Sequence, residues 1–321
     1  MVVEVDHPDR TLYAVAFHPD GIHFFGGTRD GIRRWRVADG QEVGNEMGMD
    51  IDAISVSRDG KWVVCGTMTG ASVWDAELQR KVVEVEGTNR VRAVDVPPEL
   101  TRFATATWSG KASIWSITGE RLVGPLEHDS PIRGIKFSPD GRHIVTACQL
   151  SIRIFDSYNG DQLIIIKNQL AGELVTTPIV WHFDGRLFAT SEGGKIKSFD
   201  TSTGSQIGEW EIHSHDSEDI MSVALSADNR FIASSAGHSV SFWDTSTRTQ
   251  LGNALEDGDK IRSIALSPDG TRLATGGRYN QKITIWNLSD ILPQSYLPIM
   301  VSTTFPTLGR AITFVYRCSF L

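Results

Sequence analysis

A repeat of about 40 residues runs through most of the chain and constrains its fold more than any other feature. Seven ten-residue segments align without gaps, and most carry an apolar run followed by a Pro-Asp-Gly-type turn. They are LYAVAFHPDG (12–21), IDAISVSRDG (51–60), VRAVDVPPEL (91–100), IRGIKFSPDG (132–141), TTPIVWHFDG (176–185), IMSVALSADN (220–229) and IRSIALSPDG (261–270). Successive segments start 39, 40, 41, 44, 44 and 41 residues apart, so the repeat is regular along the chain.

Each repeat predicts four short strands. A second run such as RLATGG (272–277) follows the first turn, and a Gly-, Asn-, Asp- or Ser-rich turn follows that run. The third run ends in an aromatic residue, and a fourth run such as QLGNALE (250–256) completes the repeat. The aromatic residues are Trp35, Trp74, Trp115, Phe155, Phe199, Trp243 and Trp286. Four strands in each of seven repeats leave no room for a helical domain, so the fold class is all-β.

The repeats resemble those of the WD40-repeat family. The Trp-Asp pair of that family is present at Trp74-Asp75 and Trp243-Asp244, and as Phe-Asp at 155–156 and 199–200. The other three repeats depart from it, with Trp35-Arg36, Trp115-Ser116 and Trp286-Asn287. The resemblance covers about residues 2–288 and implies a seven-bladed β-propeller.

We therefore expect residues 1–288 to form one propeller domain, with blades starting near residues 12, 51, 91, 132, 176, 220 and 261. In this family the N-terminal strand commonly completes the last blade, so residues 2–5 (VVEV) should pair with 282–286 (KITIW) and leave no open sheet edge. The C-terminal tail, residues 289–321, breaks the pattern with three prolines and is expected to be poorly ordered or loosely docked.

The resemblance also implies a buried hydrogen-bonded tetrad of His, Ser/Thr, Asp and Trp within a blade. The first repeat matches it best, and the set predicted there is His7, Thr28, Asp30 and Trp35. The Asp position is lost in the later repeats, where it is filled by Gln149, Gly193, Gly237 and Asn280. His128 keeps the His spacing in the fourth repeat without that Asp.

Motifs that carry chemistry are weak in this chain. TWSGKAS (107–113) lacks two residues of a phosphate-binding loop, with Thr105 and Ala112 at the mismatched positions, and is predicted to be a hairpin turn. His213, His215 and Asp216 carry metal-ligand side chains, but without a partner cluster a solvated loop is the favoured interpretation. No serine lies in a G-x-S-x-G elbow. We expect no enzyme activity, no metal and no cofactor.

The net charge and the N-terminal segment limit the classes of partner and the cellular compartment that we expect. A net charge of −8 argues against a nucleic-acid partner. Three cysteines exclude a complete disulfide framework, and the acidic N-terminal segment does not read as a signal peptide. No apolar run reaches the ~20 residues of a membrane span. We expect a monomeric propeller in the cytoplasm or nucleus, neither secreted nor membrane-bound.

The second position of each aligned first strand is the candidate interaction site. In the family this position lies near one opening of the central channel, and here it predicts a docking site formed by Tyr13, Arg92, Arg133, Met221 and Arg262. Arginine suits carboxylates or phosphorylated side chains, whereas acidic connections at 126–131, 215–220 and 255–260 favour a segment with basic flanks. The leading hypothesis is a non-catalytic scaffold that binds a protein or peptide. For the charged connections, the alternative is that they only keep the protein soluble. For the function, the alternative is a small-molecule-binding or catalytic propeller that uses the central channel.

Overall fold

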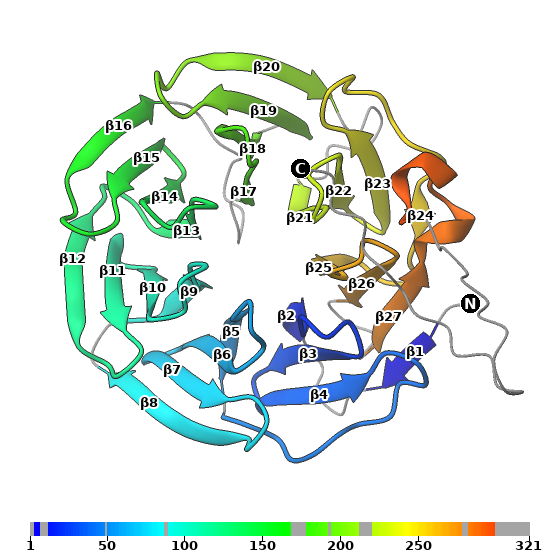
Figure 1. Cartoon of the computed structure of the whole chain (residues 1–321), viewed down its shortest axis with the longest axis horizontal. Coiled ribbons are helices and arrows are strands. Elements are labelled where there is room, and N and C mark those ends of the chain that lie inside the picture. The colour runs from blue at the N-terminus through cyan, green and yellow to red at the C-terminus, as the bar shows by residue number, and fades with distance from the viewer. Residues whose placement is uncertain are drawn as a thin grey trace, which may run out of the picture.

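The computed structural model describes residues 3–6, 12–48, 50–86, 89–167, 178–191, 194–211, 220–277 and 282–298. Seven small antiparallel sheets stand around a central axis like the blades of a propeller (Figure 1). The predicted all-β, seven-bladed fold is confirmed. We number the blades 1 to 7 along the chain and letter the strand positions A to D from the axis outward.

The strands follow the predicted four-strand unit. Blade 1 contains β2 (Leu12–Phe17), β3 (His23–Thr28) and β4 (Ile32–Arg36); blade 2 contains β5 (Ile51–Val56), β6 (Trp62–Thr67), β7 (Gly70–Asp75) and β8 (Arg80–Glu86). Blade 3 contains β9 (Val91–Asp95), β10 (Arg102–Thr107), β11 (Lys111–Ser116) and β12 (Arg121–Glu127); blade 4 contains β13 (Ile132–Phe137), β14 (His143–Cys148), β15 (Ser151–Asp156) and β16 (Gln162–Lys167). Blade 5 contains β17 (Ile179–Trp181), β18 (Arg186–Ser191), β19 (Lys195–Asp200) and β20 (Gln206–Glu211); blade 6 contains β21 (Ile220–Leu225), β22 (Phe231–Ala236), β23 (Ser239–Asp244) and β24 (Leu255–Glu256). Blade 7 contains β25 (Ile261–Leu266), β26 (Arg272–Gly277), β27 (Lys282–Asn287) and β1 (Val3–Asp6).

Burial explains the composition of the strands. The B strands lie between two neighbouring blades, so both of their faces are covered; all six residues of β10 are buried. The outermost strands expose alternate residues, as in β16. The core consists of clusters that each join adjacent blades, such as Phe24 and Trp35 of blade 1 with Ile283 and Ile285 of blade 7.

The ring closes as predicted. Strand β1 pairs antiparallel with β27, with Val3 opposite Ile285 and Val5 opposite Ile283, so the two ends of the propeller share one sheet. Figure 1 shows β1 beside β27 at the outer edge of blade 7. Val5 is buried in the cluster between blades 7 and 1, which gives the closure an apolar core as well as backbone hydrogen bonds.

Blade 1 departs from the regular unit at its outer edge. Its sheet has three named strands, and the fourth position is held by isolated bridges from Ile32 to Met47 and from Trp35 to Glu42. Gly44 and Gly48 have positive φ angles in this segment, and such turns interrupt a continuous ladder.

The segment after the last strand packs against the propeller. Two 3-10 turns, η1 (Leu288–Asp290) and η2 (Gln294–Tyr296), follow β27 and lie at the outer rim beside β24 (Figure 1). Leu288, Leu292 and Leu297 are buried in the cluster that contains Phe231 and Phe242. The predicted domain boundary at residue 288 therefore falls inside a packed segment, which corrects the expectation of loose docking for residues 289–298; residues from 299 onward lie outside the described part. Within the described part, no helix is long and apolar enough to cross a membrane.

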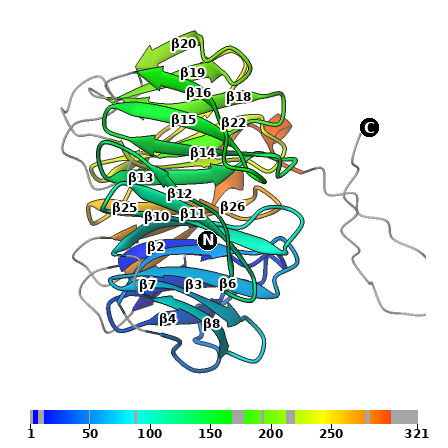
Figure 2. The same cartoon turned by 90° about the vertical axis from the view of Figure 1, so that its left-hand side faces the viewer.

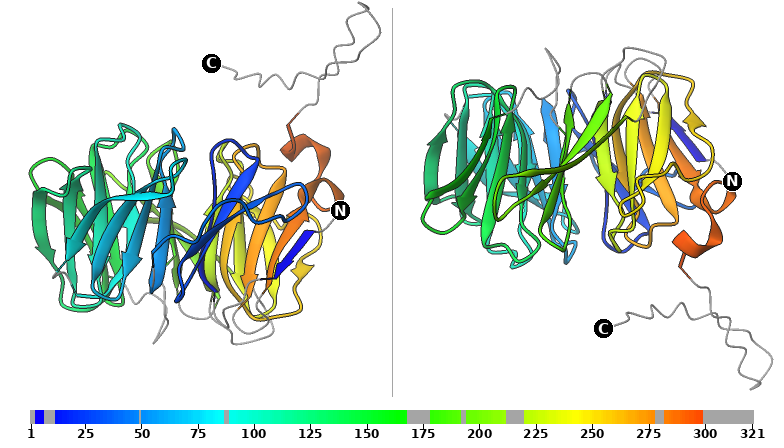
Figure 3. Two further views of the ribbon diagram at one scale, coloured as in Figure 1. Left: turned by 90° about the horizontal axis from the view of Figure 1, so that it is seen from below. Right: turned by 90° about the horizontal axis from the view of Figure 1, so that it is seen from above.

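The antiparallel order of each sheet gives the disc two distinct faces (Figures 2 and 3). The turns between strands B and C and the connections from strand D to the next strand A lie on one face, which we call the top face. The turns between strands A and B and between strands C and D lie on the opposite face, which we call the bottom face.

Candidate functional site

The second residue of most innermost strands lies at a break in the strand register. Leu12 pairs with Thr28 and Ala14 with Gly27, so Tyr13 has no opposite residue across from it. The same one-residue shift places Asp52, Arg92, Arg133, Met221 and Arg262 at bulges. A bulge turns its side chain away from the regular pleat. The recurring bulge therefore presents one side chain from each of six blades near the channel opening on the top face.

Asp52 of blade 2 joins two arginines of the next blade. Arg90 donates two hydrogen bonds to its carboxylate, with distances of 2.6 Å from Nε to Oδ2 and 2.7 Å from Nη2 to Oδ1. Arg92 adds a contact of 3.3 Å from Nη1 to Oδ1. The side chains of Asp52 and Arg92 are only 4% and 9% exposed. Burial is the largest cause that lowers the pKa of Arg92, the charges of Arg90 and Arg133 add to it, and Asp52 opposes it.

Trp108 covers this arginine cluster at the surface. It lies in the turn between β10 and β11, and its backbone N–H donates to the carbonyl oxygen of Arg90 at 2.9 Å. The guanidinium carbons of Arg92 and Arg133 lie 5.4 Å and 5.7 Å from the centroid of its ring, within the range of a cation–π interaction. The side chain is nevertheless 43% exposed. Because two guanidinium groups lie against this indole while part of it is exposed to solvent, it can supply a rigid apolar contact to a partner.

A second pair lies where blade 7 meets blade 1. The guanidinium carbon of Arg262 is 4.4 Å from the ring centroid of Tyr13, whose hydroxyl oxygen accepts a hydrogen bond from Nε of Arg29 at 3.0 Å. The strands that carry these residues, β25 and β2, are neighbours around the channel. Met221 starts the equivalent bulge in blade 6, but its side chain lies outside the described residues.

The structure thus places the predicted residues at one kind of position, but it changes their roles. Arg92 and Arg133 are nearly buried and support an aromatic ring, whereas they were expected to be the contact surface. Trp108 and Arg90 were missed by the sequence reasoning. A large aromatic residue in a turn, where other blades carry Arg29 or Met68, is the signal that could have identified Trp108.

Some of the acidic residues described on the top face make contacts within the propeller. Asp257 accepts a hydrogen bond from the hydroxyl of Thr275 at 2.6 Å, and Asp129 pairs with Arg153 at 2.7 Å. The acidic connection at 215–220 is described only at its last residue, in β21. Acidic side chains on this face therefore include members of the blade framework, not only a charged rim.

The tetrad prediction requires a correction at its threonine. In three blades the indole N–H of the strand C tryptophan donates to a hydroxyl in strand B, from Trp115 to Thr105, Trp243 to Ser234 and Trp286 to Thr275. The matching position in blade 1 is Gly26, two residues before Thr28. Thr28 instead binds the hairpin turn through Gly31 and the N–H of Asp30. His7 lies outside the described residues, and the contribution of Asp30 stays a prediction.

Two later blades carry hydrogen-bonded sets that the sequence did not reveal. In blade 7 the chain runs from Trp286 to Thr275 and on to Asp257, so an aspartate occupies the place of the family's histidine. In blade 4 Nε2 of His128 lies 2.7 Å from the hydroxyl of Thr146. Burial, with the nearby charge of Arg153, lowers the pKa of His128 to about 4. His128 is therefore neutral at pH 7.

Three other sequence features were considered as candidates for chemistry. Residues 107–113 form the hairpin between β10 and β11, in which Gly110 has a φ of +78° and no helix follows within the described residues. The hydroxyl of Thr107 accepts the N–H of Lys111 at 3.0 Å, which closes the turn. Cys65 and Cys148 are buried thiols. The residues 213–216 lie outside the described part.

Comparison with known proteins agrees with this architecture. The family model for "WD domain, G-beta repeat" matches residues 121–156, 204–244 and 247–287. Each match begins near an outermost strand and ends with strand C of the next blade, the same offset that β1 and β27 show at the closure.

Two of the similar proteins come from fungi. Eukaryotic translation initiation factor 3 subunit I of Lodderomyces elongisporus is 27% identical over 171 residues, which are 48% of this chain and 49% of that protein. Nuclear distribution protein nudF of Aspergillus niger is 27% identical over 185 residues, 49% of this chain and 42% of the relative. The chain spans about half the length of the curated relatives it matches. With seven blades in a closed ring and the WD40 repeat matched at three positions, the chain is a β-propeller that carries WD40 repeats.

Proposed function

We propose that this propeller is a non-catalytic scaffold that docks a protein or peptide segment on its top face, with Trp108 as the central anchor. The observation that carries the proposal is a 43% exposed indole held by two guanidinium groups and by a backbone hydrogen bond. Tryptophan and arginine are the residues most often found at the energetic centre of protein interfaces. A side chain already held in place loses little conformational freedom on binding, which favours affinity.

The charge around Trp108 favours an acidic or phosphorylated side chain in the bound segment. Arg90 and Arg92 both pair with the carboxylate of Asp52, and the charges of Arg90 and Arg133 add to the effect of burial in lowering the pKa of Arg92. An incoming carboxylate or phosphate next to Trp108 offsets these positive charges. The net charge of −8 on the chain as a whole supports a protein partner over a nucleic acid.

The names of the relatives are consistent with this role. One is a subunit of a translation initiation factor, and another is a nuclear distribution protein. Cytoplasmic action as a monomeric propeller remains part of this proposal. The alternative of a small-molecule or catalytic site in the central channel has less support, because the exposed indole of Trp108 lies in a turn on the top face and not in a strand that lines the channel.

Affinity capture from native extract, followed by quantitative mass spectrometry, tests the proposal. The wild-type chain and a Trp108→Ala variant serve as baits at equal amounts. We expect a defined set of proteins to be recovered by the wild type and depleted at least about tenfold by the variant, the loss that 1.4 kcal/mol produces. Equal recovery of every protein by both baits contradicts docking at Trp108.

A further inference from the structure

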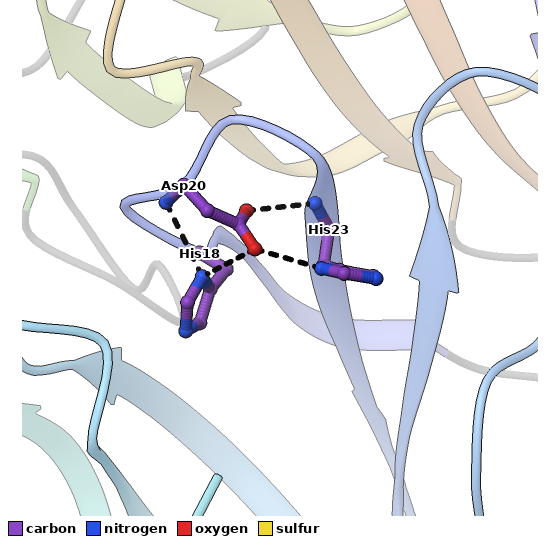
Figure 4. Close-up of side chains that lie close together, drawn as sticks. All are labelled: His18, Asp20 and His23. Atoms are coloured by element: carbon purple, nitrogen blue, oxygen red, sulfur yellow. Dashed lines mark hydrogen bonds and ion pairs between the residues drawn. The ribbon is translucent and has the colours of Figure 1, made fainter. Parts of the chain in front are cut away.

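Three potential metal ligands converge in the turn between β2 and β3, on the bottom face. Figure 4 shows Oδ2 of Asp20 between the rings of His18 and His23. It lies 3.0 Å from Nδ1 of His18 and 2.8 Å from Nδ1 of His23. All three donor atoms lie within 4.8 Å of one another, and the side chains are 19%, 30% and 25% exposed in chain order. The cluster is thus held by the fold and open to solvent.

Contacts outside the cluster already orient two of the three donors. Nε2 of His18 lies 3.0 Å from the carbonyl oxygen of Gly60 in the next blade, so this nitrogen carries the proton and donates it. Nδ1 of the same ring faces the cluster and is the His18 atom available to a metal ion. It now accepts the N–H of Asp20 at 3.2 Å, a long hydrogen bond that a metal ion can replace. Donation from the second ring nitrogen to a backbone carbonyl is the usual support of a metal-binding histidine.

Asp20 is fixed in the same way. Its Oδ1 accepts the backbone N–H groups of Ile22 and His23 at 2.7 Å and 3.0 Å, which leaves Oδ2 directed at the two imidazoles. Burial acts against ionisation, but the hydrogen bonds from His23 and the two backbone groups outweigh it and lower the pKa of Asp20 to about 2.

The other blades supply an internal comparison, because the same turn recurs in each. Blades 2, 4, 6 and 7 carry serine at the position of His18, and its hydroxyl donates to the aspartate of the turn at 2.6–2.7 Å; the residues are Ser57, Ser138, Ser226 and Ser267. Blade 5 carries His182 and Asp184, but its third residue is Arg186, which pairs with Asp184 at 2.8 Å. Blade 4 has His143 at the third position and serine at the first.

Among the described turns, only the one in blade 1 combines two histidines with the aspartate. The turns of blades 2, 4, 6 and 7 use serine at the first position, and blade 5 uses His182 together with Arg186. The second histidine is thus not needed to hold the turn, which leaves its ligand chemistry to be explained.

We propose that His18, Asp20 and His23 form a zinc-binding site on the bottom face, with three protein ligands and an open fourth position. Two imidazoles and a carboxylate are a zinc ligand set, and three protein ligands leave one position for water or a group from a partner. At Zn–N bonds of about 2.0–2.1 Å, tetrahedral ligands are roughly 3.3 Å apart. The two contacts to Oδ2 lie slightly inside this distance, and the two histidine nitrogens close from at most 4.8 Å toward it. Zinc binding at Nδ1 of His23 requires the proton on that nitrogen to move through solvent to Nε2 of the same ring, which frees the Nδ1 lone pair for the metal.

Isothermal titration calorimetry of the full chain with Zn²⁺ tests the site. Two variants reproduce solutions that the fold itself uses: His18→Ser copies the serine turns, and His23→Arg copies the Asp184–Arg186 pair of blade 5. His23→Arg should therefore keep the melting temperature of the metal-free chain, whereas His18→Ser also removes the hydrogen bond to Gly60, so zinc affinities are compared below the melting temperature of each variant. We expect the wild type to bind one equivalent of Zn²⁺ whose affinity falls more than about 100-fold in each variant, because even the outer contacts of a metal site are worth roughly 10–100-fold.

The absorption of bound Co²⁺ provides a second measurement of the site. A double variant, His213→Ser with His215→Ser, is the control for metal binding by the other histidine pair. Tetrahedral Co²⁺ bound by the wild type should give visible ligand-field bands that both turn variants lose and that the 213/215 variant retains. The proposal is overturned if the wild type binds no zinc, if the turn variants bind it with an affinity within about threefold of the wild type, or if the signal disappears in the 213/215 variant. Because this site lies on the face opposite Trp108, its failure leaves the proposed docking site unaffected.

Discussion

The hydroxyl oxygen of Ser263 in β25 accepts a hydrogen bond from the backbone N–H of Val15 in β2 at 3.1 Å, although 248 residues separate the two. The same relationship joins Ser222 to the N–H of Ile264 at 3.2 Å one blade earlier. Side chains of the innermost strands thus bind the backbone of the next blade. The last blade is therefore attached to the first at the axis as well as at the rim, where β1 completes its sheet.

Deletion of residues 1–6 should lower the melting temperature of the whole propeller. The deletion removes the outer strand of blade 7, exposes the edge of β27 and takes Val5 out of the cluster between blades 7 and 1. Glu4→Gln is the matched control, because the ion pair of Glu4 with Lys282 is exposed and such pairs contribute about 0–1 kcal/mol. Differential scanning calorimetry of the three proteins checks this. An unchanged transition in the deletion variant contradicts the role of β1.

Leu292→Ala should destabilise the domain by about 2–5 kcal/mol, the usual cost of truncating a buried leucine. Leu292 is 4% exposed and packs with Leu251 and Leu255 in the cluster of blades 6 and 7. Tyr296 adds a hydrogen bond of 2.5 Å from its hydroxyl to Oδ2 of Asp244. Urea unfolding of wild type and variant gives the difference in free energy. A change below about 0.5 kcal/mol, the range of ordinary surface substitutions, means that this segment does not belong to the folded unit.

Trp35→Ala should cost about 3–5 kcal/mol, because the indole is 2% exposed and stacks on Phe24 with 5.4 Å between ring centroids.

Thr105→Val in blade 3 should cost about 1–3 kcal/mol, because it leaves the indole N–H of Trp115 buried without its acceptor. Chemical denaturation measures both. If Thr105→Val has no effect, the indole–hydroxyl pair does not stabilise its blade.

Stability should fall between about pH 6.5 and pH 4 through His128. Its pKa in the folded state is about 4, below the ordinary value of 6.5, so the unfolded chain binds more protons in this range and protonation favours unfolding. The stabilising contribution is complete above pH 6.5 and is lost as the pH falls toward 4. Melting temperatures at pH 7.5 and 5 should differ less for His128→Asn than for the wild type. Equal differences in the two proteins mean that His128 does not titrate in this way.

The repeat made the fold predictable from the sequence, because seven copies of one pattern fix the blade count, the strand order and the closure together. Side-chain register within a blade was less accessible. Thr28 and Gly26 both lie in β3, and only the pairing of Phe24 with Trp35 shows which of them faces the indole. A shift of two residues leaves a side chain on the same face of the strand, so alternation could not distinguish these two positions.

The candidate site was predicted by position but not by exposure. The aligned second residue identifies Arg92 and Arg133 because the bulge recurs in the register of the repeat. Their burial depends on Trp108, which lies in a turn outside the aligned ten residues and reaches over them. The ligand set of His18, Asp20 and His23 was also missed, since each residue is ordinary for a turn and only the folded hairpin brings the three donor atoms together.

The affinity of a captured partner for matched tryptophan variants tests the docking claim most directly. Trp62 is the control for Trp108, because it also has a cation over its ring, with Nζ of Lys61 4.6 Å from the centroid, but lies beside the turn that follows β5 on the bottom face. Surface plasmon resonance with the purified partner should show at least roughly a 30-fold loss of affinity for Trp108→Ala, about the 2 kcal/mol that defines an interface hot spot. Trp62→Ala should bind within about twofold of the wild type. Equal binding by Trp108→Ala, or a larger loss for Trp62→Ala, contradicts docking on the top face.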